Sequence, residues 1–89
     1  MTHSKTLKIP NELGLHARAA AKLAKLAEDA KAGVFIAKDG EEVDATSILD
    51  VIGLYCPYGS NITVRIADKA DMKVLDQIVG LIETGFGEF

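Results

Sequence analysis

The chain has 89 residues, 48% of them hydrophobic, with a formal net charge of −3 and a pI of about 5.2. This length predicts one domain over residues 1–89, with a modest core and no deep cleft between domains. The net negative charge argues against a nucleic-acid partner, because proteins that bind nucleic acids usually carry a basic face. No apolar run approaches the roughly 20 residues of a membrane span, and the first residues lack the apolar stretch of a signal peptide. The single cysteine, Cys56, excludes an internal disulfide, so we expect a cytoplasmic protein without membrane insertion and with an inert thiol.

The residue pattern predicts seven elements in the order β-α-β-β-α-β-α. Alternation of polar and apolar residues, with β-branched content, predicts strands over residues 6–9, 34–37, 41–45 and 61–66. Apolar residues at helical spacing predict helices over residues 17–31, 48–53 and 72–84. We expect Gly33 to stop the first helix, Asp39-Gly40 to form a hairpin turn and Asp71 to cap the last helix.

Four short strands with one apolar face need cover, which two long amphipathic helices provide. We therefore expect an α+β fold, with a four-stranded antiparallel sheet covered on one face by helices. The other face of the sheet is expected to contact solvent, as is usual for antiparallel sheets.

The segment from Gly14 to Ala20 carries the strongest functional signal. His16 lies where a glycine-bearing loop gives way to an alanine-rich helix, and Arg18 follows two positions later. A helix start presents unpaired backbone N–H groups and the positive end of the helix dipole, which together suit phosphate. An imidazole there is a nucleophile beside a place for a phosphoryl group, and the guanidinium of Arg18 matches phosphate oxygens. The alternative interpretation is an ordinary surface pair of histidine and arginine.

A second helix start, at Ser47, allows two interpretations. Serine is favoured there simply as an N-cap, and Ser47 with Asp50 three residues later resembles a capping box. A phosphate also suits a helix start, so capping and regulatory phosphorylation of Ser47 are compatible.

The helix after Ser47 is too short to bury more than one side. We expect Val51 to take part of that buried side, which leaves an apolar patch beside His16 that marks an interaction site. The patch consists of Ile48, Leu49 and Ile52. The alternative is that all three side chains belong to the core.

The order of elements and two motifs together resemble the HPr family, the histidine-containing phosphocarriers of the bacterial sugar phosphotransferase system. The first motif is Gly14-Leu15-His16-Ala17-Arg18, which resembles the phosphohistidine block of the family. The second is Thr46-Ser47-Ile48-Leu49, followed at family-like spacing by Leu54 and Gly59. The resemblance covers residues 6–82 and implies an open-faced β-sandwich.

The resemblance implies a phosphoryl relay. In the family, Enzyme I transfers a phosphoryl group from phosphoenolpyruvate to the loop histidine, which passes it to sugar-specific carriers. His16 would then be the acceptor, Arg18 would balance the phosphoryl charge, and Ser47 would match a serine that a dedicated kinase phosphorylates. The implied partners are Enzyme I, sugar-specific or nitrogen-type EIIA proteins and an HPr serine kinase/phosphorylase, and the chain would be a monomeric protein substrate within a transferase system. The resemblance also assigns partner docking to Ile48, Leu49 and Ile52.

Three features depart from the family pattern: Ala19 where proline is usual, the bulky loop Tyr55-Cys56-Pro57-Tyr58, and Asp50 within the docking helix. These departures do not affect the implied relay role, but they do not identify the partner. The alternative function is therefore a regulatory binding module of a nitrogen-type or incomplete phosphotransferase system. His16 and Arg18 argue against a purely regulatory module. An independent enzyme lacks a second convergent catalytic group, and no metal-ligand spacing is present, so we expect no cofactor and no metal.

Overall fold

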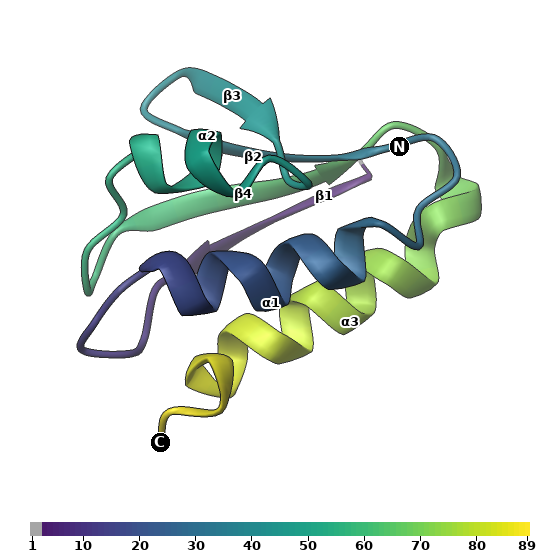
Figure 1. Cartoon of the computed structure of the whole chain (residues 1–89). Coiled ribbons are helices and arrows are strands. Elements are labelled where there is room, and N and C mark those ends of the chain that lie inside the picture. The colour runs from purple at the N-terminus through teal and green to yellow at the C-terminus, as the bar shows by residue number, and fades with distance from the viewer. Residues whose placement is uncertain (1–2) are drawn as a thin grey trace.

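The computed structural model describes residues 3–89 as one sheet with helices packed on it (Figure 1). Within these residues the four strands are β1 (Ser4–Lys8), β2 (Val34–Lys38), β3 (Glu41–Asp44) and β4 (Asn61–Ile66). The three α-helices of the same residues are α1 (Ala17–Ala27), α2 (Ile48–Gly53) and α3 (Met72–Glu83), with short 3-10 turns η1 (Lys69–Asp71) and η2 (Gly85–Gly87). None of the helices in this described part is long and apolar enough to cross a bilayer.

The sheet has the strand order β1-β4-β2-β3, and every neighbouring pair is antiparallel. The helices lie along one face of it, so the expected α+β fold with one covered face is confirmed (Figure 1). The hairpin between β2 and β3 turns at Asp39 and Gly40, whose φ angles of 52° and 85° are those of the expected tight turn.

Alternation along the strands separates a buried face from an exposed face. Inward side chains of the sheet pack against the apolar stripes of α1 and α3, and Val51 of α2 closes the same core. The fully buried core side chains include Ile9, Leu23, Val34, Ile36, Val51, Ile62, Val64, Ile66, Ile78 and Ile82. On the outer face, Arg65 pairs with Glu42 at 2.8 Å and its guanidinium lies 4.6 Å from the centre of the Phe35 ring.

Helix α1 ends at Ala27, so the predicted extent to residue 31 and the predicted stop at Gly33 were wrong. After Ala27 the chain makes tight turns rather than another helical turn. The backbone N–H groups of Lys31 and Ala32 donate to the Asp71 carboxylate, each at 2.9 Å. These bonds hold the pKa of Asp71 below its usual value. A side chain 40 residues downstream therefore competes with continuation of the helix.

Asp71 precedes α3 as predicted, but its carboxylate makes no capping bond to that helix within residues 3–89. Its oxygens are engaged by the segment after α1 instead. Asp68 caps the adjoining turn η1 by accepting from the N–H of Ala70 at 2.9 Å. The side chain that caps a helical turn here is thus that of Asp68, three residues before the predicted Asp71.

The five residues after α3 and its cap, hereafter the tail (residues 85–89), fold back toward the start of α1 (Figure 1). Gly85, Phe86 and Gly87 all have left-handed backbone, with φ of 64°, 57° and 78°. The Phe86 side chain is fully buried, and Lys22 of α1 donates to the Phe86 carbonyl oxygen at 2.7 Å. The tail is therefore an ordered, packed segment, whereas the sequence had indicated nothing more than a chain end.

Candidate functional site

His16 occupies the N-cap position of α1, as the sequence predicts. Its backbone is extended (φ −81°, ψ −179°), and its carbonyl oxygen accepts from the N–H of Ala20 at 2.8 Å. Its side chain makes no capping bond within residues 3–89, so the imidazole is available for other contacts. The first turn of α1 carries no acidic side chain, and its first N–H groups have no carbonyl partner in the helix. This helix start therefore keeps its positive end for an anion.

The loop before His16 is held by side-chain and backbone bonds at both ends. The buried Asn11 donates from Nδ2 to the carbonyl oxygen of Gly14 at 2.9 Å, and Leu15 N donates to Cys56 O at 2.9 Å. Gly14 has a φ of +68°, and a Cβ atom there would lie 2.5 Å from Cys56 O. Only glycine satisfies both the backbone angle and the close approach, so the loop fixes where His16 begins the helix.

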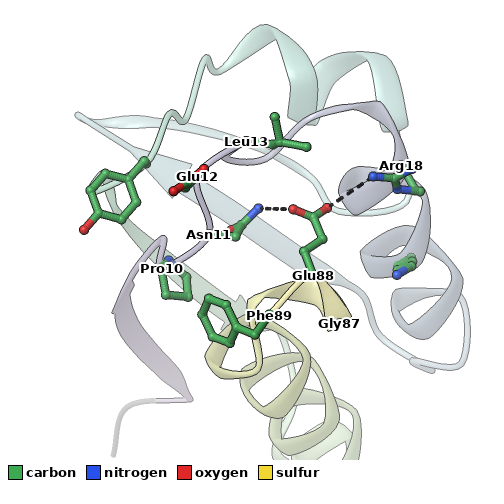
Figure 2. A pocket seen from close by; sticks show the side chains of 10 residues that line it. Pro10, Asn11, Glu12, Leu13, Arg18, Gly87, Glu88 and Phe89 are labelled. Carbon is green, nitrogen blue, oxygen red and sulfur yellow. Dashed lines mark hydrogen bonds and ion pairs between the residues drawn. The ribbon is translucent and has the colours of Figure 1, made fainter.

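Glu88 of the tail reaches the imidazole and completes a cluster that the sequence did not reveal. Figure 2 shows its contacts with Asn11 and Arg18. Its Oε2 accepts from Nε2 of His16, and its Oε1 accepts from Nδ2 of Asn11 at 2.9 Å. Nη2 of Arg18 lies 3.9 Å from the same Oε2. The hydrogen bonds from His16 and Asn11 hold the pKa of the Glu88 carboxyl below its usual value. The structure thus brings the two predicted residues together through a third.

The three charged or titratable side chains differ in exposure, and that difference bears on their roles. The exposed fraction of the side chain is 24% for His16, 16% for Glu88 and 66% for Arg18. The imidazole is partly accessible and bonded to Glu88, whereas the guanidinium is mostly exposed to solvent. Arg18 can therefore turn toward a phosphoryl group that arrives at His16.

The start of α2 lies near this cluster, and its residues are placed largely as predicted. Leu49 and Ile48 are 81% and 38% exposed, while Val51 is fully buried. Ile52 is half-buried against the core and lines a shallow hollow together with His16. The patch predicted to dock partners (Ile48, Leu49 and Ile52) thus borders the hollow of the imidazole through Ile52.

Further exposed apolar side chains surround the cluster on the tail side, and the sequence had pointed only to Tyr58 among them, as part of the bulky loop 55–58. Leu13, Tyr58 and Phe89 are each more than 60% exposed and line an open hollow that also includes Arg18 and Glu88 (Figure 2). Leu13 and Phe89 lie in segments without helical or strand periodicity, so the residue pattern gives no signal for them.

Ser47 is the N-cap residue of α2, but the predicted capping box is wrong. Its side chain makes no capping bond within the described part of the chain. The preceding turn is organised by Asp44 instead, which accepts from both the N–H and the hydroxyl of Thr46, at 2.9 and 2.8 Å. Ser47 is half-buried, and its hydroxyl is not used to cap the helix.

Cys56 is buried, and burial raises the pKa of its thiol, in keeping with the inert cysteine that the sequence predicts. Among residues 3–89, no group of three or more histidine, cysteine, aspartate or glutamate side chains is placed to hold a metal ion. The chemistry available at the cluster is therefore that of the imidazole, the guanidinium, the carboxylate and the helix start.

Two residues of the cluster escaped sequence analysis. Asn11 opens the loop that contains Gly14, and asparagine is a common turn residue, but this composition does not predict its bond to Glu88. Glu88 follows Gly85-Phe86-Gly87, in which two glycines flank an aromatic residue. That pattern indicates a left-handed turn, but it does not tell which part of the molecule the turn faces.

Similarity to known proteins extends over most of the chain and includes His16 and Arg18. The family described as "PTS HPr component phosphorylation site" matches residues 3–84, which stops just before the tail. "Phosphocarrier protein HPr" of Cupriavidus necator is 40% identical over 80 residues, covering 90% of each chain. "Phosphocarrier protein NPr" of Escherichia coli K12 is 34% identical over 89 residues, covering 99% of each chain. The crystal structure of HPr-C-His from Thermoanaerobacter tengcongensis superposes with a TM-score of 0.90 at 30% identity, covering 97% of both chains.

Proposed function

The chain belongs to the HPr family of phosphocarriers of the phosphotransferase system, and we propose that His16 is the residue on which it carries the phosphoryl group. The observation that supports this most is the position of the imidazole at a helix start without acidic side chains, with Arg18 within reach. Such a start stabilises a phosphoryl group through its free N–H groups and dipole. The exposed guanidinium adds a mobile positive charge.

The chemistry required is a direct transfer between two nucleophiles. The lone pair of a ring nitrogen of His16 forms a bond to phosphorus while the bond from phosphorus to the donor atom breaks. The donor keeps that electron pair, and the imidazole ring gains positive charge. Arg18 and the first N–H groups of α1 stabilise the phosphoryl oxygens during the transfer. No water, oxidant or further proton enters this step.

The donor and the acceptor are proteins in this proposal. The hollow that His16 lines and the one lined by Arg18 and Glu88 are both open to solvent, which does not suit enclosure of a small substrate. Exposed apolar side chains around a reactive group instead suit a protein interface. Docking through Ile48, Leu49 and Ile52 places the partner beside the imidazole. Enzyme I is the proposed donor and an EIIA protein the proposed acceptor.

Relatives named HPr and NPr both match this chain, so both the sugar-type and the nitrogen-type EIIA are candidate acceptors. The chain is proposed to act in the cytoplasm as a monomer, because a carrier must expose His16 to two partners in turn. Transfer from the phosphorylated chain to each type of purified EIIA distinguishes the acceptors, and sedimentation velocity measures the oligomeric state.

Ser47 is a second candidate for phosphorylation, in a regulatory role. Its half-buried side chain makes no capping bond in residues 3–89, and it directly precedes the docking patch. A phosphate there would add negative charge where a partner must bind. An HPr serine kinase/phosphorylase is the proposed modifying enzyme.

The chain contains two histidines, which offers a matched control for the acceptor assignment. Purified Enzyme I and radiolabelled phosphoenolpyruvate should label the wild type and His3→Ala equally, and should not label His16→Ala. The label should be lost in acid and kept in base, as expected for phosphate on a ring nitrogen. Undiminished labelling of His16→Ala would show that the acceptor lies elsewhere.

A further inference from the structure

Helix α2 ends in an aromatic residue that has a backbone conformation typical of glycine. The C-cap of α2 is Leu54, and the next residue, Tyr55, has a left-handed φ of 55°. The N–H of Tyr55 donates to the carbonyl oxygen of Ile52 at 3.0 Å, which closes the last turn. Glycine usually takes this position after a helix, because a Cβ atom there is crowded by the following carbonyl oxygen. Tyr55 therefore costs the fold stability that glycine would not.

Burial does not offset that cost. Among residues 3–89, three residues other than glycine have a positive φ, namely Asp39, Tyr55 and Phe86. Asp39 lies in the hairpin turn, where aspartate is common, and Phe86 is fully buried, so packing imposes its conformation. The exposed fraction of Tyr55, in contrast, is 72%. A strained and exposed ring contributes little to the core, and such strain is typical of positions where a function requires the conformation.

One side chain from the sheet holds Tyr55 in this conformation. Lys38, the last residue of β2, donates from Nζ to the carbonyl oxygen of Tyr55. The same ammonium lies 5.3 Å from the centre of the Tyr55 ring, within the range of a cation–π interaction. The first contact fixes the backbone and the second orients the ring. The ring is thus ordered before any partner arrives.

The ring borders the hollow that contains the imidazole. Tyr55 lines this hollow together with His16 and Ile52, and Ile52 belongs to the docking patch. The next residue, Cys56, accepts from the N–H of Leu15 at 2.9 Å, which links the Tyr55 segment to the residue before His16. A protein whose reactive group reaches His16 must therefore approach Tyr55 as well as the docking patch.

We propose that Tyr55 is a docking residue for phosphoryl transfer: its ring, held by Lys38, packs against an apolar surface of Enzyme I when that protein reaches His16. This inference rests on the proposed function of His16. The ammonium of Lys38 lies over one side of the ring, which leaves the other side for an apolar surface. Enzyme I is the occupant because the donor is the same in both versions of the proposed relay, whereas the acceptor differs between them.

An ordered tyrosine is well suited to this role. Its ring offers a large contact area and, already fixed by Lys38, loses little conformational entropy on binding. For this reason a few tyrosine, tryptophan and arginine side chains often dominate the affinity of a protein interface. The stability that Tyr55 costs the free chain is thus recovered in the complex.

Tyr55→Gly tests this inference, because it removes the ring and supplies the residue that the backbone favours. The Kd of the unphosphorylated chain for Enzyme I, measured by isothermal titration calorimetry, should rise roughly tenfold, the size of effect expected for an interface tyrosine. The KM for transfer from Enzyme I should rise in the same proportion, with kcat unchanged. The Tm should not fall, since glycine relieves the strained backbone. Tyr55→Phe keeps the ring and should match the wild type in all four quantities.

Met72→Ala is the control for the loss of an exposed apolar side chain. Met72 is 42% exposed and begins α3, directly after Asp71, whose carboxylate binds the segment that follows α1. It therefore lies near the end of α1 that is remote from His16. Both the Kd and the KM for Enzyme I should remain those of the wild type in this variant.

Lys38→Met tests the role of Lys38 as a positioning residue, since it keeps the aliphatic chain and removes the ammonium. It should weaken the binding of Enzyme I less than Tyr55→Gly does. In a chain that already carries Tyr55→Gly, adding Lys38→Met should weaken binding no further, because Lys38 acts through the ring. Additive losses would contradict this role.

A wild-type Kd and KM in Tyr55→Gly would overturn the inference, and so would a fall in its Tm, which would show that the ring serves the fold. Slower transfer to an EIIA protein with unchanged binding of Enzyme I would overturn the choice of Enzyme I. Should Enzyme I bind the wild type without labelling it, the proposed function of His16 fails, yet the Kd values still decide whether Tyr55 is a docking residue. No binding of the wild type by Enzyme I would overturn both.

Discussion

The starts of α1 and α2 are built alike and differ in what surrounds them. Each begins at a polar residue with extended backbone, His16 or Ser47, and neither side chain makes a capping bond within residues 3–89. His16 contacts Glu88, which is 72 positions away in sequence. Ser47 is held by backbone bonds to residues no more than four positions away: its N–H donates to Asp44 O, and Val51 N donates to its carbonyl oxygen.

This difference teaches what turns a helix start into a chemical site. A free helix start attracts anions wherever it occurs, so the dipole alone does not distinguish the two. At α1 the first turn adds Arg18 and no acid, whereas at α2 it adds Asp50. A long-range contact with Glu88 then holds the imidazole of His16, while within residues 3–89 no hydrogen bond holds the hydroxyl of Ser47. This difference supports the proposal of carrier chemistry at the first start and regulation at the second.

Removing the Phe86 side chain, which anchors the tail, should have the largest effect on the start of α1. Phe86→Ala deletes a fully buried ring, which costs about 3–5 kcal/mol of stability, and it frees Glu88 from His16. Phe89→Ala, which truncates a side chain that is 79% exposed, should change stability by less than ~0.5 kcal/mol. Urea unfolding of both variants measures this; equal stabilities would mean that the tail is not anchored by Phe86.

Gly14→Ala should disturb the loop that places His16. The left-handed φ and the approach to Cys56 O together predict a loss of about 2–5 kcal/mol. Gly40→Ala isolates the backbone contribution, because Gly40 also has positive φ but no atom within 4 Å of an added Cβ, and it should lose about 1–2 kcal/mol. Thermal unfolding compares them. A Gly14→Ala variant no less stable than Gly40→Ala would mean that the loop tolerates displacement from Cys56.

Ser47→Asp sharpens the comparison from the side of α2. A carboxylate at this helix start is tolerated by the dipole, so the fold should persist, but it adds to the charge of Asp50 beside the docking patch. Transfer from Enzyme I should slow by about fivefold, equivalent to ~1 kcal/mol. Ser47→Ala is the control and should transfer at the wild-type rate. Equal rates for all three proteins would remove Ser47 as a control point.

Ala19→Pro has the smallest expected effect and concerns the start of α1 itself. Ala19 is the third residue of the helix, where the N–H lacks a helical partner, so proline should stabilise the protein by roughly 0.4–1 kcal/mol. It also removes a donor that is available to a phosphoryl group on His16, so the phosphorylated fraction at equilibrium with Enzyme I should fall slightly. A lower Tm would instead show that the fully buried Ala19 site has no room for the ring.

The sequence predicts the elements that depend on neighbouring residues, and its predictions fail where contacts with distant segments decide the structure. Strand β4 and helix α2 match their predicted bounds, and the Asp39-Gly40 turn forms as expected, because periodicity and turn residues determine them. The end of α1 was wrong because the Asp71 carboxylate binds the backbone after it. At the site, His16 and its helix start were predictable from neighbouring residues. Glu88 was not, because its position depends on how Phe86 packs.

The atom of the protein that bears the phosphoryl group tests the central claim most directly. The chain, labelled with ¹⁵N and phosphorylated by Enzyme I and phosphoenolpyruvate, is examined for coupling between ¹⁵N and ³¹P. We expect coupling to a ring nitrogen of His16. Phosphorus that is coupled to no ring nitrogen of His16, or is held as an ester on Ser47, would contradict the account.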